Sequence, residues 1–282
     1  MAAVVAVLAS GGGSHARAHT ARTVPSTASA AQGGGGNAAT RSTGAPLGHA
    51  ESAAVRSLVS LGRPIYCAAR RGNEVALTFD DGPGPYTRLV IKKLHLHDAG
   101  ATFFDVGRNI DLIAGATAQE RALGAVGDHT FTHPLLTALA PAEAEREIVR
   151  TQTALARSTG GPVFLFRPPY GGRNPTIDAI VRAHGLLQIL WTVDSGDSLG
   201  ANYAQIERNV IGGLRGGAII LMHENHGQTV RALPNIFAAL RSRHLRAVSV
   251  PQLLTDDPPS VAQVLGGGAA CGVHGRAALG GG

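Results

Sequence analysis

Two adjacent carboxylates stand beside a Gly-Pro pair in the sequence TFDDGP, residues 78–83. Along a regular strand Asp80 and Asp81 would point to opposite faces, but the Gly82-Pro83 turn lets the backbone bend so that both can face one cavity. Two like charges this close do not both ionise freely without a cation. The pair therefore indicates an acidic, cation-binding site or, taken alone, an ordinary Asp-Asp-Gly-Pro turn.

A second motif, HTFTH, places two imidazoles four residues apart, at His129 and His133. This spacing corresponds to one helical turn and lets two rings bind one metal, and Pro134 disfavours helix at His133. Such a pair alone is usually uninformative. With a carboxylate from Asp81 it becomes a His₂Asp set with an open position, as in catalytic rather than structural zinc sites. Imidazole and carboxylate ligands favour Zn²⁺, with Co²⁺ as an alternative.

A stiff, proline-restricted motif, RPPYG, carries a cation at Arg167. Arginine donates bidentately to carboxylates, so Arg167 is a candidate partner of Asp80. The two prolines leave the next backbone N–H at Tyr170, which is a candidate donor to a developing oxyanion. The alternative is an arginine that only stabilises a surface loop.

The motif LMH ends an apolar run with His223, and Asp197 lies in the loop after the preceding run. A carboxylate beside an imidazole raises the pKa of the ring, as a general acid near neutral pH requires. The two residues are therefore a candidate acid and its partner. A histidine satisfied within the core is the alternative.

Short apolar runs precede most of these residues, and such runs are typical of strands buried on both faces. The runs are residues 75–79, 102–106, 163–166, 187–193, 218–222 and 247–250. Helical patterns alternate with them, including one opened by Pro141 and one capped by Asn174. This alternation predicts an α/β fold with a parallel sheet, open or closed into a barrel, whose chemistry gathers at the carboxyl ends of the strands.

Glycine marks the ends of the 282-residue chain, because 17 of the 38 glycines lie in residues 1–50 and 259–282. The 208 residues between them are the size of a single α/β barrel. We expect a signal-like or disordered leader over 1–58, one domain over 59–258 and a disordered Gly-rich tail over 259–282. The formal charge of +6 falls to +2 without the tails, which argues against a nucleic-acid-binding protein.

The sequence gives thinner indications of location. No apolar stretch is long enough to span a membrane. Residues 2–8, AAVVAVL, resemble a short signal-peptide core without a charged start, which favours secretion or the cell envelope over an unstructured Ala-rich terminus. Cys67 and Cys271 could close a disulfide in an exported protein, but the place of Cys271 in the Gly-rich tail argues against this pairing.

In this order and at these separations, TFDDGP, HTFTH, RPPYG, the aspartate Asp197 of DSGDS, and LMH resemble the five motifs of the polysaccharide deacetylase family (carbohydrate esterase family 4, the NodB-homology domain). The resemblance covers about residues 70–255. It implies a distorted (β/α) barrel and metal-dependent removal of acetyl groups from N-acetylated, or sometimes O-acetylated, sugars.

The resemblance also implies one role for each matching residue. It implies that Asp80 is the catalytic base, that Arg167 orients this base, and that the metal ligands are Asp81, His129 and His133. It further implies that His223 is the general acid and Asp197 its acidic partner. Tyr170 corresponds to the backbone oxyanion donor and Leu221 to an apolar wall of the acetyl pocket. The family usually has Trp after the aspartate of the fourth motif, and this chain has Ser198. That departure bears on substrate fit and rate rather than on the metal site.

The implied substrate is a polysaccharide or oligosaccharide that contains N-acetylglucosamine, such as peptidoglycan or chitin-like oligomers. In the implied reaction Asp80 deprotonates a metal-held water and His223 protonates the departing amine. Because Ser198 departs from the pattern, O-deacetylation of acetyl-xylan or hydrolysis of another C–N bond is an alternative. A catalytically inactive glycan-binding module is a third reading, although every chemical position is filled.

Overall fold

One parallel sheet organises the described part of the chain. The computed structural model describes residues 49–273, which lie within a single compact unit. The strand order is β5-β4-β3-β2-β1-β7-β6, β8 pairs with the start of β1, and the strands named here all pair in parallel. The strands are β1 Glu74–Gly82, β2 Ala101–Asp105, β3 Gly124–Asp128, β4 Leu165–Phe166, β5 Leu187–Gln188, β6 Val193–Asp194, β7 Ile219–His223 and β8 Arg246–Val248.

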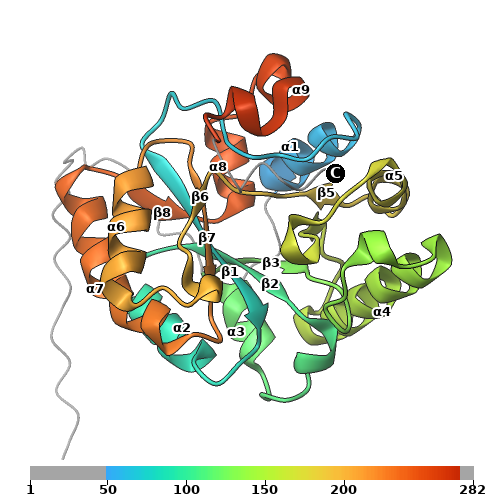
Figure 1. Ribbon diagram of the computed structural model, residues 1–282, viewed down its shortest axis with the longest axis horizontal. Coiled ribbons are helices and arrows are strands. Elements are labelled where there is room, and N and C mark those ends of the chain that lie inside the picture. Colours follow the sequence, from blue (N-terminus) through green and yellow to red (C-terminus); the bar gives the residue numbers. More distant parts are fainter. Residues whose placement is uncertain (1–48, 274–282) are drawn as a thin grey trace, which may run out of the picture. The chain divides into compact units, whose positions relative to one another are not determined.

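Helices surround this sheet. Within the described residues they are α1 His49–Val59, α2 Thr87–Leu96, α3 Ala116–Leu123, α4 Pro141–Thr159, α5 Pro175–Ala183, α6 Tyr203–Gly213, α7 Gly227–Ser242, α8 Val250–Asp256 and α9 Val261–Ala270. Figure 1 shows α6 and α7 on one side of the sheet and α4 and α5 on the other. The helix starts predicted at Pro141 and Asn174 are confirmed, and the Asn174 side chain accepts a hydrogen bond from the N–H of Ile177.

The apolar run of β1 is buried on both faces, as its composition predicted. Leu77 and Phe79 belong to the core cluster shared with α2, α6 and α7. Ala76 belongs to a second cluster shared with α1 and α8. A strand that neighbours hydrophobic clusters on both sides is held firmly, which fixes the position of the polar residues at its end.

The run at residues 187–193, predicted as one strand, is two short strands at opposite edges of the sheet. β5 pairs with β4, whereas β6 pairs with β7. Between them the backbone of Ile189 bridges to Ile65 and the N–H of Thr192 donates to the carbonyl of Ile219. The chain therefore crosses from one edge to the other within one apolar run, and the sheet curls into the distorted (β/α) barrel that was expected.

The sequence reasoning missed β3, whose residues GAVGD include two glycines. A Cβ at Gly124 would lie 2.3 Å from the carbonyl oxygen of Ala101, and one at Gly127 would lie 2.6 Å from the ring of Phe104. Small residues are required here because the neighbouring strand and ring approach closely. They also remove the apolar signal by which a buried strand is recognised.

The ends of the body differ from the expected boundaries at residues 58 and 259. Val55 and Leu58 of α1 are buried against the body, and α1 packs on α8. At the other end residues 261–270 form α9, which is kinked at Gly267, where φ is 57°, and Val264 is buried in the core. The remainder of the expected leader and tail, residues 1–48 and 274–282, lies outside the described residues.

The prediction against a disulfide is wrong, because Cys67 and Cys271 are bonded, with their Cα atoms 5.8 Å apart. The disulfide links the segment after α9 to the strand-like segment before β1, and both cysteines are buried in a cluster with Val273. In the described part of the chain no helix has the length and apolarity needed to cross a membrane.

Candidate functional site

The two aspartates of TFDDGP lie where β1 becomes irregular. Asp80 is in register with His223 of β7, but Asp81 is an extra residue in the ladder with β2 and has a left-handed backbone with φ 71°. An inserted residue breaks the alternation of side chains between the two faces of a strand. As a result Asp80 Oδ2 and Asp81 Oδ1 both approach Nε2 of His129, at 3.7 and 3.6 Å.

The imidazole pair of HTFTH lies in a loop after β3 rather than on a helix, so the predicted helical turn is wrong. Thr130 and His133 have left-handed backbones, with φ 66° and 64°. The N–H of His133 donates to Thr130 Oγ1 at 3.1 Å, which holds the loop closed. The two rings nevertheless pack edge to face, with centroids 4.9 Å apart. Four-residue spacing brought the rings together through a tight loop.

Asp81, His129 and His133 form a set that fits a tetrahedral divalent metal. Asp81 Oδ1 lies 3.6 Å from His129 Nε2 and 3.2 Å from His133 Nε2. Ligand atoms bound tetrahedrally at about 2.0–2.2 Å are separated by roughly 3.3–3.6 Å, which these distances match. Asp81 Oδ1 is buried and accepts no hydrogen bond from the described residues, as expected of an oxygen placed for a metal.

Neighbouring groups set the protonation states of Asp81, His129 and His133. His129 Nδ1 lies 2.7 Å from the carbonyl oxygen of Arg167, so it must carry the proton, and Nε2 keeps its lone pair for a metal. Burial alone would raise the pKa of Asp81, but the imidazoles of His129 and His133 and the amide of Asn225, 3.1 Å from Oδ2, help to bring it below its usual value. Burial and the neighbouring ring of His129 lower the pKa of His133. Both effects favour the metal-binding protonation states.

Arg167 follows β4 and is completely buried beside Asp80. Its Nη1 donates to Asp80 Oδ1 at 2.7 Å and to Thr78 Oγ1 at 2.8 Å. Its guanidinium also lies over the ring of Phe104, 4.2 Å from the centroid. Burial of a guanidinium requires a partner charge, and Asp80 supplies it. The structure thus brings the predicted pair together and fixes the orientation of the Asp80 carboxylate.

His223 and Asp197 form a second buried pair across the site. Asp197 Oδ1 lies 2.7 Å from His223 Nδ1, while Oδ2 accepts from the N–H of His223 at 2.7 Å and from Thr229 Oγ1 at 2.6 Å. The N–H of Ser198 donates to Oδ1 at 2.8 Å. Every neighbour is a donor, which only an ionised carboxylate accommodates.

The protonation of this pair follows from its contacts. Although burial opposes charge on both residues, the bond to Asp197 raises the pKa of His223 to about 9, and the same bond helps to lower the pKa of Asp197 to about 2. The imidazole is therefore protonated at neutral pH, with Nε2–H free to donate because Nδ1 faces the carboxylate. That is the state a general acid needs.

The remaining predicted residues border the same edge of the sheet. Tyr170 has a left-handed backbone with φ 61°, and its exposed ring lies 4.8 Å from that of His133. Leu221 is buried on β7, in register with Thr78 and Asp194. Ser198 is exposed. The structure therefore gathers the predicted site residues at the carboxyl edge of the sheet.

Several polar residues at the site were missed by the sequence reasoning. They support the chemistry through hydrogen bonds, and they include Thr78, Asn109, Asn225 and Thr229. Thr78 belongs to TFDDGP but was given no role there, and the other three belong to no motif with a recognisable spacing, so only the fold reveals their contacts. Asp105, Glu120 and Glu224 were also missed, although a charge within the apolar run TFFDV was a visible anomaly at Asp105.

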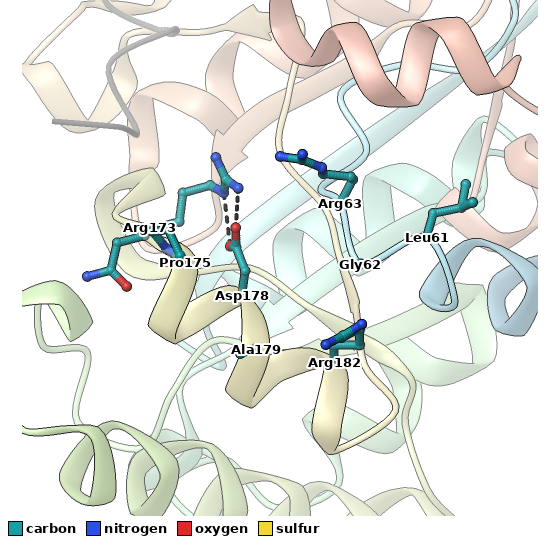
Figure 2. A pocket seen from close by; sticks show the side chains of 9 residues that line it. Leu61, Gly62, Arg63, Arg173, Pro175, Asp178, Ala179 and Arg182 are labelled. Atoms are coloured by element: carbon teal, nitrogen blue, oxygen red, sulfur yellow. Dashed lines mark hydrogen bonds and ion pairs between the residues drawn. The ribbon is translucent and has the colours of Figure 1, made fainter.

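A pocket of about 660 Å³ lies between α5 and the loop after α1, and Figure 2 shows its lining side chains. Arg173 forms an ion pair with Asp178 on this wall. Arg63 and Arg182 are exposed and form no ion pair with the described residues. The pocket therefore carries an excess of positive charge, and none of the predicted catalytic residues lines it.

Comparisons with known proteins agree with the geometry. A sequence model of the family described as polysaccharide deacetylase matches residues 68–189. The chain is 34% identical over 187 residues to the peptidoglycan-N-acetylglucosamine deacetylase PgdA of Listeria monocytogenes, an alignment that covers 66% of this chain and 40% of that protein. It is 33% identical over 196 residues to a chitooligosaccharide deacetylase of Azorhizobium caulinodans, covering 64% of this chain and 93% of that protein.

Solved structures show the same likeness in three dimensions. A peptidoglycan N-acetylglucosamine deacetylase crystallised with a naphthalenyl N-oxidanyl-benzamide superposes with a TM-score of 0.66 at 30% identity, covering 70% of this chain and 95% of that one. The chain spans about 40% of the length of the Listeria protein.

Proposed function

The chain belongs to the polysaccharide deacetylase family, and from that premise we propose that it is a metal-dependent hydrolase that removes acetyl groups from polysaccharides containing N-acetylglucosamine. The observation that carries the proposal is the convergence of three units on one sheet edge: Asp80 with Arg167, the His₂Asp set, and His223 with Asp197. Each unit corresponds to one requirement of amide hydrolysis.

We assign the metal to Asp81, His129 and His133, with Zn²⁺ as the first candidate and Co²⁺ as the second. When bound, such an ion lowers the pKa of water towards ~7 and polarises a carbonyl group. Asp80, held by Arg167, lies within 3.7 Å of His129 Nε2 and is placed to take the proton of the attacking water at its Oδ2.

The other residues act on the acetyl group and on the departing amine. His223 donates the proton of Nε2 to the leaving nitrogen, because an amine leaves poorly without that proton. The backbone N–H of Tyr170 donates to the oxyanion, and Leu221 provides an apolar wall for the acetyl methyl. For an ester substrate, whose oxygen leaves more easily, His223 would matter less.

The pocket beside the site favours an anionic glycan over neutral chitin or xylan. Arg173 follows Tyr170 by three residues, so their Cα atoms are at most about 11 Å apart. Arg182 on α5 and Arg63 on the loop after α1 add further positive charge to the pocket. Peptidoglycan carries carboxylates on its peptides, and guanidinium groups pair with carboxylates in the geometry they prefer. We therefore place peptidoglycan first among the substrates.

The disulfide supports an extracellular or cell-envelope location, since disulfides persist in oxidising compartments. The proposed substrate class requires the same location. A secreted protein or one held in the cell envelope is accordingly our proposal.

Metal-dependent acetate release tests the function. The protein is stripped with a chelator, reloaded with Zn²⁺ or Co²⁺ and assayed on peptidoglycan, chitin oligomers and acetyl-xylan. We expect release that requires metal, and we expect Asp80→Asn to bind metal but lose turnover by roughly 100-fold or more. His184→Gln, a surface histidine paired with Glu145, is the matched control and should retain full activity.

The panel also separates the alternatives. Acetate from acetyl-xylan alone would replace the N-deacetylase by an O-deacetylase. Tight glycan binding without acetate from any substrate at saturating metal would identify a binding module and refute the enzymatic proposal. Full activity in Asp80→Asn would remove the assigned base.

A further inference from the structure

Three fully buried carboxyl groups lie behind the candidate active site, and the proposed reaction uses none of them. Asp105 ends β2, Glu120 lies on α3 and Glu224 follows β7 directly. All three have no exposed surface, and one carboxylate oxygen from each lies within 4.8 Å of the others. We call these three residues the carboxylate cluster.

No positive side chain in the described part of the chain compensates the cluster. Among residues 49–273 no Lys, Arg or His forms an ion pair with any of its members. Burial first, and then the charges of neighbouring carboxylates, raise the pKa of Glu120 and Glu224 well above the usual value. Burial raises the pKa of Asp105 to about 6. A buried set of like charges needs a counter-charge or protons.

Two threonines orient the outer oxygens of the cluster. Thr117 Oγ1 donates to Asp105 Oδ2 at 2.8 Å, and Thr87 Oγ1 donates to Glu224 Oε2 at 2.5 Å. Four oxygens remain that accept no hydrogen bond from the described residues: Asp105 Oδ1, Glu224 Oε1 and both oxygens of Glu120. Glu120 is thus a completely buried side chain that accepts no hydrogen bond from a donor among the described residues, and it lies within hydrogen-bonding reach of the carboxyl groups of Asp105 and Glu224.

The backbone of β1 leaves room for this arrangement at Gly82. A Cβ at that position would lie 1.5 Å from Glu224 Oε1 and 3.3 Å from Asp105 Oδ1. Only a residue without a side chain allows the two oxygens to approach the strand. The glycine of TFDDGP therefore serves the cluster as well as the turn.

We propose that the carboxylate cluster binds a second, structural cation that prefers oxygen ligands, with Ca²⁺ ahead of Mg²⁺. Glu120 is placed to bind with both oxygens, and Asp105 and Glu224 with one each. One carboxylate oxygen from each of the three residues lies within 4.8 Å of the others, so a single cation can contact all three. Ca²⁺ comes first because it accepts bidentate carboxylates in flexible geometry, whereas Mg²⁺ demands near-octahedral geometry and usually keeps several waters.

Shared protons are the competing explanation. A proton joins two oxygens, so two protons would be needed to satisfy the four unpartnered oxygens, whereas one cation satisfies all of them. Hydrogen bonds that fix the outer oxygens of carboxylates are the arrangement found around metal ligands. The two explanations make opposite predictions for Glu120→Gln, because an amide imitates a protonated carboxyl group but removes a charged ligand.

The cluster is joined to the active site by the backbone. The N–H of Glu224 donates to the carbonyl of Asp80 at 3.2 Å, and the carbonyl of Asp105 accepts from the N–H of His129 at 3.0 Å. A cation here would tie β1, β2, β7 and α3 together behind the residues that do the chemistry. Its binding is a property of the fold and does not depend on the proposed deacetylase activity.

Calcium binding to the chelator-treated protein tests the proposal. We expect equilibrium dialysis to find one Ca²⁺ per chain in Asp81→Asn, which lacks a ligand of the other metal set. We expect millimolar Ca²⁺ to raise the thermal unfolding midpoint by several degrees in the wild type and in Asp111→Asn, whose carboxylate is exposed. Glu120→Gln should lose both the bound Ca²⁺ and this rise.

Two results would overturn the inference. One is that neither Ca²⁺ nor Mg²⁺ binds to Asp81→Asn at millimolar concentration. The other is a Glu120→Gln protein that, without added metal, is at least as stable as the Ca²⁺-treated wild type, which would assign the cluster to shared protons. If Glu120→Gln does not fold, dialysis with Asp81→Asn alone decides the question.

Discussion

Replacement of Asp197 by Asn tests whether that carboxylate sets the protonation of His223. The bond between them raises the pKa of His223 to about 9 from an ordinary 6.5. This difference corresponds to about 3 kcal/mol in favour of the imidazolium. In Asp197→Asn the burial of the ring remains and the charge is lost, so the pKa of His223 should fall to 6.5 or below.

The expected rate loss follows from the protonated fraction. At pH 8 a ring with a pKa of about 9 is about 90% protonated, whereas one with a pKa of about 6.5 is about 3% protonated, a difference of about 30-fold. Acetate release from an N-acetylated oligomer should therefore fall by about 30-fold or more at pH 8. In the wild type the rate should decline only as the pH rises through about 9. An aryl acetate, whose leaving group needs little protonation, should lose much less.

The same pair makes a pH-dependent contribution to stability. Because the folded pKa of His223 is raised, this contribution is complete below about 6.5 and is lost as the pH rises through about 9. Asp197→Asn also places an NH₂ group among four donors, so its unfolding midpoint must be measured and rates scaled to folded protein. Asp111→Asn, whose exposed carboxylate pairs with Arg157, is the control. An alkaline limit that stays near pH 9 in Asp197→Asn would refute the assignment.

Two further predictions concern substrate charge and the disulfide. The double variant Arg63→Gln/Arg182→Gln should raise KM for peptidoglycan by roughly 5-fold to 10-fold, as expected for the loss of two partly exposed ion pairs. KM for neutral chitin oligomers should stay unchanged. Equal effects on both substrates would contradict the role proposed for the pocket. Cys271→Ser should lower the free energy of unfolding by up to about 5 kcal/mol, because the disulfide closes a loop of 204 residues. A reductant should have the same effect on the wild type. If neither change affects stability, α9 stays packed on the body without the disulfide.

The strand ends were predictable because they follow from local signals. The runs that became β1, β2, β4 and β7 are each apolar and bounded by polar residues, so the placement of Asp80, Arg167 and His223 on one edge followed from parallel pairing. The His₂Asp set also followed, since imidazole spacing and a nearby carboxylate are visible in one dimension. For these residues, the side-chain type and the position at the end of a predicted strand were enough to predict their place in the site.

Other features depend on contacts that no short window contains. The strand β3 was not predicted because its glycines are required by close contacts with the carbonyl of Ala101 and the ring of Phe104, which are distant in sequence. The split of residues 187–193 depends on which strand each half meets. α9 is glycine-rich and was assigned to the tail, yet it is held by burial of Val264 and by Cys271. Tertiary contacts override local propensity in each of these cases.

The left-handed backbone at four site residues has a consequence for how this protein can change over evolutionary time. Asp81, Thr130, His133 and Tyr170 all adopt a conformation that glycine tolerates far better than they do. A mutation to glycine at Asp81 or His133 would relax the main chain and at the same time remove a side chain of the proposed metal set. A single substitution could therefore relieve the backbone and abolish the proposed metal site together.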